Sequence, residues 1–524
     1  MRRLVAGAVA ATLAVGAAVA VVPSSGAATR SHHRVGHVAA GGSLTMLEGG
    51  GYVGNWTAGL NPLTAPNDTA QATLMNAIYG QLFQLGPHGQ IIDDLATGYQ
   101  LSSNSRQLTV TLRHGVSFTD GTPFNAAAVA YNWRQDIANK GASGAPDWPS
   151  PTISTSGPYV VVLKLGAPDS AAFNAIQDST ANWIISPSAV QRLGKVNAGI
   201  HPVGAGPFEV VSDTPSVKLV LRRNPHYWQA GHPYLSSLTF VDVSGDEAAL
   251  QDLQAGNGQA YEYMGTPSLV PAFKSRGFKV TTDVNGTPLA LAFNTLTAPF
   301  NSLKAREAVS YATNTAALDR LLYGGGSPIV QSFTAPSDLF YEAKVPGYRT
   351  YDLAKAKALV KQLGGLSFNI FYLETGTSLQ TLEALQTMYE AAGMKVTISN
   401  DPTPAGIALW ESGKWQAEMG TIGDWDPAKE LELHLGYGEA FSGVKDAHLQ
   451  SLLNAAISVS TLSGRSAVYH RIAAYLSQKD YYVFFFPSIT YDIAAKGVTG
   501  PGLTSALPGF QGGPQILWQD VRSS

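Results

Sequence analysis

Residues 112–123 read LRHGVSFTDGTP, and this stretch predicts a complete joint between a strand and a helix. The residues before it alternate between threonine and an apolar side chain up to Leu112, which is the pattern of a strand with one buried face. Asp120-Gly121 supplies residue types that tolerate a positive φ in a tight turn. Asn125 is the expected N-cap of a helix over residues 126–139, because its side-chain oxygen can accept from a free amide of the first turn.

A second block lies at residues 204–234 and contains the runs GAGPF and LRRNPHYW and then GHPY, which is followed by Leu235. Each run has a local interpretation: the glycines permit a bend, Asn224-Pro225 ends a strand, and the Tyr227-Trp228 pair anchors the packing. Strand patterns are also present upstream, where residues 101–112 are expected to pair with a strand at residues 159–165. The first half of the chain is therefore expected to be rich in strands.

The second half alternates between helices and strands. Asp352 is a predicted N-cap, and the glycines at 324–326 predict the end of a helix. This β-α-β alternation is typical of a parallel sheet covered by helices. Helices are expected at residues 302–313, 315–322, 352–363, 378–392, 449–458 and 465–479, and strands at 289–294, 366–373, 395–399 and 482–486.

Two further blocks complete a pattern that resembles a known family. Residues 291–320 contain Phe293-Asn294 and Leu318-Asp319-Arg320, and residues 423–427 read GDWDP. In their order, the four blocks resemble the family 5 extracytoplasmic solute-binding proteins, the peptide- and nickel-binding class that serves ABC importers. The resemblance extends from about residue 43 to residue 492. One departure is the alanine run at 126–128, where the family usually has acidic residues in the first helical turn.

The resemblance implies an α/β, two-lobed, periplasmic-binding-protein-like fold (type II, class C), with hinge strands and an inserted subdomain in the first lobe. The chain is expected to cross between the lobes near residues 283–289 and 486–491. The expected parts are a signal peptide (1–27), a disordered linker (28–42), lobe 1 (43–284, with the inserted subdomain at about 86–190), lobe 2 (285–490) and a C-terminal return to lobe 1 (491–524).

The first residues predict secretion. Arg2 and Arg3 precede an uncharged run over residues 4–22, and small residues follow, so cleavage is expected after Ala27 or Ala28. An uncleaved membrane anchor is the alternative. The chain contains no cysteine, which excludes disulfides, thiolate catalysis and lipidation on cysteine. The protein is thus expected to be extracytoplasmic, that is secreted, periplasmic or associated with the cell envelope, without a lipoprotein anchor.

Composition excludes several classes of function. Without residues 1–27 the chain has 32 basic and 37 acidic residues, a net charge of −5, which does not suggest a nucleic-acid-binding surface. The Gly-x-Ser-x-Gly, His-Glu-x-x-His, Walker and EF-hand patterns are absent from the sequence. We therefore expect no enzyme activity, no catalytic residue, no cofactor and no resident metal. A secreted hydrolase acting on peptides or glycosides is the alternative from another class.

The candidate ligand site is assigned from the resemblance to the loop at residues 423–427. In several peptide binders of the family an acid in this loop pairs with the free amino group of the peptide. Asp424 is the expected acid, because Asp426 before Pro427 is explained by turn chemistry, although the choice between the two stays open. The alternative interpretation of the other candidates is that the aromatic residues belong to the core and Asn294 ties a loop. The expected ligand-binding residues are Asp424, Trp425, Asn294, Tyr52, Trp410 and Trp415.

The resemblance also implies the partners. The expected ligand is a short peptide or a related small solute held between the lobes and delivered by a monomeric protein to an ABC permease with its ATPase subunits. A nickel chelate or an oligosaccharide is the alternative ligand. The nickel interpretation is the weaker one, because His226 and His232 lie in a block that is explained as a structural hairpin.

Overall fold

A computed structural model describes most of the chain from residue 41 onward. The expected signal peptide, most of the expected linker, Tyr52, Asp424 and Trp425 lie outside the described residues. The described residues are 41–49, 60–64, 69–87, 89–139, 146, 148–373, 379–401, 403–423, 426–437, 439, 442–509, 513 and 515–524.

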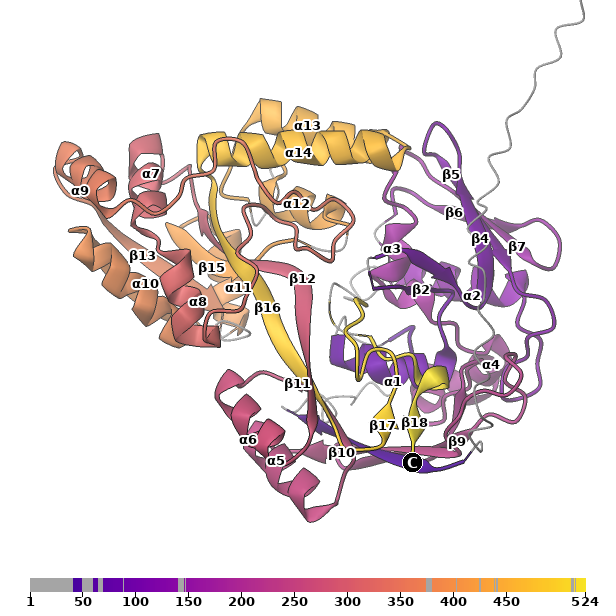
Figure 1. The fold of residues 1–524 in the computed structure, drawn as a ribbon. Coiled ribbons are helices and arrows are strands. Elements are labelled where there is room, and N and C mark those ends of the chain that lie inside the picture. The colour runs from indigo at the N-terminus through magenta and orange to yellow at the C-terminus, as the bar shows by residue number, and fades with distance from the viewer. Residues whose placement is uncertain are drawn as a thin grey trace, which may run out of the picture. The chain divides into compact units, whose positions relative to one another are not determined.

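The main element is one mixed sheet of ten strands (Figure 1). At one end β1 pairs in parallel with both β10 and β11, and at the other end β13 pairs in parallel with both β14 and β15. The parallel pairing predicted for residues 366–373 and 395–399 is confirmed. In order across the sheet, the strands are β14 (Lys395–Asp401), β13 (Ser367–Leu373), β15 (Ala417–Thr421), β12 (Lys279–Phe293), β16 (Tyr482–Ala494), β11 (Ala260–Met264), β1 (Ser43–Gly49), β10 (Ser237–Val243), β9 (Lys218–Arg223) and β8 (Phe208–Thr214).

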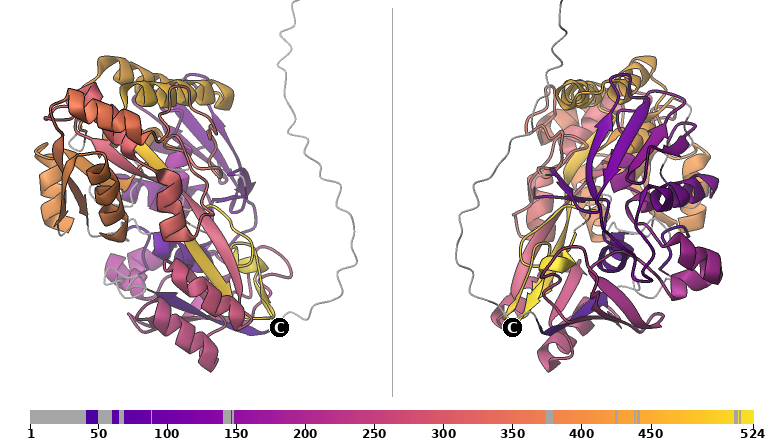
Figure 2. Two further views of the ribbon diagram at one scale, coloured as in Figure 1. Left: turned by 60° about the vertical axis from the view of Figure 1, so that its left-hand side comes forward. Right: turned by 90° about the vertical axis from the view of Figure 1, so that its right-hand side faces the viewer.

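Two long antiparallel strands, β12 and β16, connect the two ends of this sheet (Figures 1 and 2). Their register shifts on both sides of the pair formed by Pro288 and Pro487. Proline has no backbone N–H, so the ladder is weakened at this point. On one side of it β16 also pairs with β11, and on the other side β12 also pairs with β15. Separate hydrophobic cores lie at the two ends, so the same two strands serve both.

The helices largely follow the predicted ranges. Asp352 accepts from the Lys355 amide at 2.9 Å and caps α9, and Gly324 ends α8 in the left-handed conformation. The helices are α1 (Thr69–Tyr79), α2 (Ala126–Ala138), α3 (Asn174–Gln177), α4 (Pro187–Ile200), α5 (Asp246–Ala255), α6 (Val270–Ser275), α7 (Leu303–Ala312), α8 (Thr315–Tyr323), α9 (Leu353–Gln362), α10 (Leu379–Ala391), α11 (Thr403–Glu411), α12 (Ala428–Leu435), α13 (Ala447–Ser458) and α14 (Leu462–Lys479).

A second sheet of four antiparallel strands has its own core together with α2. Its order is β4 (Ala96–Leu101), β5 (Gln107–Leu112), β7 (Val160–Lys164) and β6 (Thr152–Thr155). The predicted pairing with residues 159–165 is confirmed for β5. Residues 102–106 are a turn instead of part of one long strand, and Ser105 has a φ of 52° there. The polar run at this turn separates β4 from β5. Short strand pairs are β2 (Phe83–Leu85) with β3 (Ile91–Asp93), and β17 (Val498–Thr499) with β18 (Arg522–Ser523).

The strand-to-helix joint at residues 112–125 forms as predicted. Asn125 accepts from the Ala128 amide at 3.0 Å and caps α2, and Gly121 has a φ of 80° in the turn. Asp120 accepts from the Ser186 hydroxyl at 2.7 Å, which fastens the turn to the start of α4. These contacts give the joint a role in folding.

The first two sequence blocks also contact each other. The Arg113 guanidinium lies 3.8 Å from the centre of the Trp228 ring, and the Thr119 amide donates to the Gly204 carbonyl at 2.9 Å. A Cβ atom at Gly204 would lie 2.2 Å from the carbonyl oxygen of Ile78, so only glycine fits at this approach to α1. The residue types of both blocks are therefore explained by packing.

Candidate ligand cavity

A cavity of about 350 Å³ lies beside β12, just before the Pro288–Pro487 pair. Its size is within the range of pockets that hold small solutes. The wall is mostly apolar, and Asp283 is the only acidic residue among those that line it in the described part of the chain. It is formed by segments far apart in the sequence: Pro87, residues 282–284, Pro328, residues 336–337, residues 506–508 and Gly513.

Four buried acidic side chains extend across the sheet from this cavity. They are Asp283 on β12, Asp492 on β16, Glu262 on β11 and Glu48 on β1, and each is at most 3 % exposed. The four strands are consecutive neighbours in the sheet. We call this group the acid ladder.

Strand alternation places the ladder on a single face of the sheet. Residues two positions away from its members, Met46, Ala260 and Ala494, share one hydrophobic core, and the intervening residues face a different core. Asp492 is paired across the strands with Thr281, which is two residues from Asp283 on β12. The four acidic side chains therefore lie on the face that is covered by α1.

Burial and the neighbouring acids both favour the protonated forms. Burial, followed by the negative charge of Glu262, raises the pKa of Glu48 well above its ordinary value. Burial raises the pKa of Glu262 to about 7, although hydrogen bonds from Thr73 and Glu48 oppose the shift. Burial also raises the pKa of Asp283, which is hydrogen-bonded to Asp492. Among the described residues, no ion pair involves Glu48, Glu262 or Asp283.

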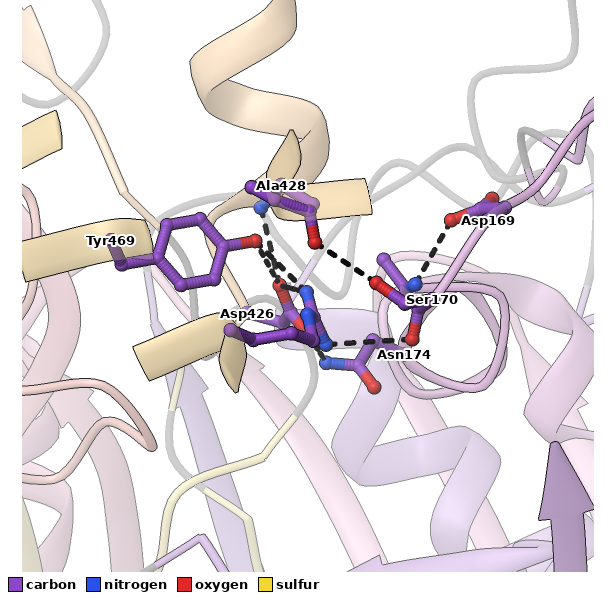
Figure 3. Close-up of polar contacts among 9 residues, drawn as sticks. Asp169, Ser170, Asn174, Asp426, Ala428 and Tyr469 are labelled. Atoms are coloured by element: carbon purple, nitrogen blue, oxygen red, sulfur yellow. Dashed lines mark hydrogen bonds and ion pairs between the residues drawn. The ribbon is translucent and has the colours of Figure 1, made fainter. Parts of the chain in front are cut away.

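A second buried polar cluster, which we call the clasp, is centred on Asp426 and Arg465 (Figure 3). Two Arg465 nitrogens contact the two Asp426 carboxylate oxygens, each at 2.5 Å, and both side chains are at most 3 % exposed. The Tyr469 hydroxyl donates to the same carboxylate at 3.1 Å. The Asn174 amide, from α3, donates to it as well. This is a bidentate, charge-assisted arrangement.

The clasp joins segments that belong to different cores. The Ser170 hydroxyl donates to the Ala456 carbonyl at 2.9 Å, and the Lys429 ammonium lies 3.6 Å from Asp169. Residues around 172–176 pack in the core of the four-stranded sheet, whereas Tyr469 packs in a core at the β13 end of the main sheet. Burial alone would lower the pKa of Arg465, but the Asp426 carboxylate and Tyr469 raise it above its ordinary value.

Asp426 has the turn contact expected from its position before Pro427, since its carboxylate accepts from the Ala428 amide at 3.2 Å. Its ion pair was not predicted, because Arg465 is 39 positions away in the sequence and Asn174 is 252 positions away. The acid ladder was missed too, although it has a sequence signal. Glu48 continues the alternation of Leu44 and Met46, which places an acid on an apolar face.

Three of the predicted ligand-binding residues lie within the described part of the chain. Asn294 is buried, and its amide donates to the Gly413 carbonyl at 3.0 Å and to the Trp415 carbonyl at 2.9 Å. These bonds use both amide hydrogens to tie a loop, which was the alternative interpretation. Trp415 is a core residue against Phe371, and Trp410 is half-buried beside His434. None of the three lines the described cavity, and their contact with a ligand stays a prediction.

The histidines considered for a nickel chelate are in the expected hairpin block. The His232 ring lies 3.3 Å from the Asp520 carboxylate and packs against Tyr234. Within the described residues, no group of three or more His, Cys, Asp or Glu side chains is arranged to hold a metal ion.

Comparison with known families identifies the class of protein. Residues 90–440 match the model of the bacterial extracellular solute-binding proteins, family 5 Middle. This match covers more than half of the chain, and the chain belongs to that family.

Two curated relatives are glutathione-binding proteins. The chain is 29 % identical over 387 residues to GsiB of Salmonella typhimurium, covering 70 % of this chain and 72 % of the relative. It is 28 % identical over 407 residues to GsiB of Escherichia coli O157:H7, covering 75 % and 78 %.

Solved structures confirm the fold prediction. The ABC transporter substrate-binding protein CtaP of Listeria monocytogenes superimposes with a TM-score of 0.78 at 21 % identity, covering 92 % of this chain and 98 % of that one. DppA of Helicobacter pylori, solved with the peptide STSA, gives 0.73 at 20 % identity with the same coverage. The chain is accordingly a solute-binding protein. Among the described residues, no helix combines the length and apolar character needed to span a membrane.

Proposed function

We propose that this protein captures a short peptide, or a peptide-like solute such as glutathione, and delivers it to a membrane permease. The observation that carries the proposal is the cavity beside β12, whose wall is formed by segments from several parts of the chain. The size and mostly apolar lining of the cavity suit a small solute with few charged groups. Relatives that bind glutathione and peptides support the same class of ligand.

Binding is proposed to shift an equilibrium between open and closed forms. The weakened ladder at Pro288 and Pro487 supports a hinge in β12 and β16, because motion there breaks few hydrogen bonds. The boundaries proposed for the lobes, at residues 284 and 490, lie near this point, on the side where β16 also pairs with β11. The clasp is then one of the contacts that favour the closed form, since it joins the core of the four-stranded sheet to α14.

The protein is further proposed to act outside the cytoplasm after cleavage of residues 1–27, as a monomer and without catalytic turnover. Membership in a family of extracellular solute-binding proteins supports the location. Incubation with peptides and glycosides, followed by mass spectrometry, is expected to show every solute unchanged. Steady release of a cleaved product would instead favour the secreted hydrolase.

Calorimetry on the purified mature protein tests the ligand class. Glutathione and unmodified di-, tri- and tetrapeptides are expected to bind with one site per chain, and native mass spectrometry is expected to detect such molecules co-purifying. Recovery of a single sugar or a metal chelate, with no peptide binding, would overturn the proposal.

The role of Asp424 is tested with the same peptides. Because a charge-assisted contact with the peptide amino group would be lost, Asp424→Asn is expected to weaken binding of free-amine peptides by about tenfold or more. Peptides with an acetylated amino end are expected to bind the variant and the parent protein alike. Equal affinity of the two proteins for free-amine peptides would remove Asp424 from the site.

A further inference from the structure

We propose that the acid ladder receives a cationic group of the ligand, an ammonium or a guanidinium, at Asp283. This inference rests on the proposed function and specifies its ligand: a solute that carries a positive charge at the end placed beside β12. The proposed contact is made by β12 and is a different one from the contact with the amino end of a peptide that the family resemblance assigns to residues 423–427.

The orientation of Asp283 is the first observation. Thr281 and Asp283 share one face of β12, because they are two residues apart in a strand. The Thr281 hydroxyl donates to the Leu503 carbonyl at 3.0 Å, which places this face toward the C-terminal segment. That segment continues into residues 506–508, and these line the cavity together with Asp283. The Asp283 side chain therefore points to the cavity side of the strand.

The second observation is a carboxylate oxygen of Asp283 that accepts no hydrogen bond from the described part of the chain. Asp283 is 3 % exposed, and its Oδ2 atom has no hydrogen-bond partner among the described residues. Glu48 Oε1, at the other end of the ladder, is also buried and has no hydrogen-bond partner among the described residues. Buried polar atoms in proteins are nearly always hydrogen-bonded, so an unpartnered carboxylate oxygen beside a cavity indicates a missing donor.

The charges around Asp283 specify a cation as that donor. Its neighbours on β16 and β11 are Asp492 and Glu262, and Asp242 adds a further carboxylate beside Glu48. The basic residue on the same face of β12 is Lys279, and its ammonium donates to the Thr504 carbonyl. An anionic group would be repelled by this row of acids, whereas a cation would be attracted.

The lining selects an organic cation over a metal ion. No metal-binding group of three or more side chains is found in the described part of the chain. Pro87, Val284 and Leu507 supply apolar surface next to Asp283. Such surface suits the methylene stem of a lysine- or arginine-like side chain, whose charged end then reaches the carboxylate.

The clasp shows, within this protein, a buried carboxylate that is neutralised by a guanidinium. Asp426 is as deeply buried as Asp283, and it is compensated by the guanidinium of Arg465 with two contacts of 2.5 Å. We infer that a ligand cation does for Asp283 what Arg465 does for Asp426. Burial raises the pKa of Asp283 and of Glu48, so a cation that stabilises their carboxylate forms is expected to release protons when it binds.

The test compares the tripeptides Ala-Lys-Ala and Ala-Gln-Ala by calorimetry at pH 7. The lysine peptide is expected to bind the parent protein about tenfold more tightly or better. Repeating the titration in two buffers of different ionisation enthalpy is expected to show proton release with the lysine peptide alone. Equal affinities of the two peptides would overturn the inference.

Asp283→Asn is the decisive variant, and Asp252→Asn is its matched control. Asp252 is on α5, which packs on the opposite face of the same strands. Asp283→Asn is expected to reduce the preference for lysine to within about twofold while the glutamine peptide binds as before. The control is expected to keep the full preference. A preference that persists in Asp283→Asn would overturn the inference.

Two further measurements separate the possible failures. If Asp283→Asn does not fold, as judged by circular dichroism, Glu48→Gln replaces it and is expected to reduce both the preference and the proton release. If neither peptide binds the parent protein, the peptide ligand of the proposed function is wrong. Free arginine and agmatine are then titrated, and absence of binding by these cations would overturn the inference as well.

Discussion

The clasp and the acid ladder bury carboxylates to the same extent and compensate them in opposite ways. In the clasp a single carboxylate, Asp426, receives a bidentate arginine, a tyrosine hydroxyl and an amide. In the ladder four carboxyl groups share hydrogen bonds with one another and with Thr73. Burying an uncompensated charge is costly, so the ladder depends on protons or on a ligand where the clasp uses the chain itself.

The largest expected effect comes from removing the cation of the clasp. Arg465→Met leaves Asp426 buried without its partner, which is expected to lower the free energy of unfolding by about 3–5 kcal/mol. Urea unfolding followed by circular dichroism measures this change. The double variant Arg465→Met/Asp426→Asn is expected to recover part of the loss, because the uncompensated charge is also gone. Arg192→Met on the exposed side of α4 is the control and is expected to change stability by less than about 0.5 kcal/mol.

For the ladder, in contrast, we expect the free energy of unfolding to depend on pH. The pKa of Glu262 is raised to about 7 from an ordinary value of 4.5. The folded state therefore holds its proton more tightly than the unfolded state, so its contribution to stability is full below pH 4.5 and is lost as the pH rises through 7. Between pH 4.5 and pH 8 the loss is expected to be roughly 2–3 kcal/mol.

Comparison with Glu262→Gln isolates this contribution from other titrating groups. The stability of the variant relative to the parent is expected to improve on going from pH 4.5 to pH 8, as measured by urea unfolding at both values. A difference between the two proteins that does not change with pH would mean that Glu262 titrates normally.

A smaller effect is expected from the contact that joins α3 to the clasp. Asn174→Ala removes a donor to Asp426 and leaves the Arg465 pair in place. Because this contact is proposed to favour the closed form, ligand affinity is expected to fall by several-fold up to about tenfold. Calorimetry measures the affinity, and small-angle scattering of the unliganded variant is expected to show a larger mean radius. Asn197→Ala, on the exposed part of α4, is the control.

The two clusters also show which parts of this molecule can be predicted from the sequence. The caps at Asn125 and Asp352 were predicted correctly, because each depends on an amide three residues away. Residues 112–123, through their resemblance to a family, also indicated the overall fold. The Asp426–Arg465 pair was not predictable in this way, since its partners are brought together only by the packing of α14.

The acid ladder could be predicted from the sequence only in part. Glu48 follows the apolar alternation of Leu44 and Met46, so its burial is visible locally, whereas Asp283 follows Lys279 and Thr281 on its face of β12 and has no such signal. The adjacency of the four acids depends on the order of β12, β16, β11 and β1 in the sheet. That order is set by long-range pairing, and strand patterns alone do not specify it.

An effect of about the same size as that of Asn174→Ala distinguishes charge from hydrogen bonding within the clasp. Tyr469→Phe removes a hydroxyl that donates to Asp426 at 3.1 Å and keeps the ring that packs against Phe340. Because Arg465 still neutralises the carboxylate, the free energy of unfolding is expected to fall by only about 1–2 kcal/mol. In the Arg465→Met background the remaining donors to Asp426 are this hydroxyl, the Asn174 amide and the Ala428 amide, so the same substitution is expected to cost more there. A double-mutant cycle by urea unfolding measures the difference, and strict additivity would mean that Arg465 and Tyr469 act on Asp426 independently.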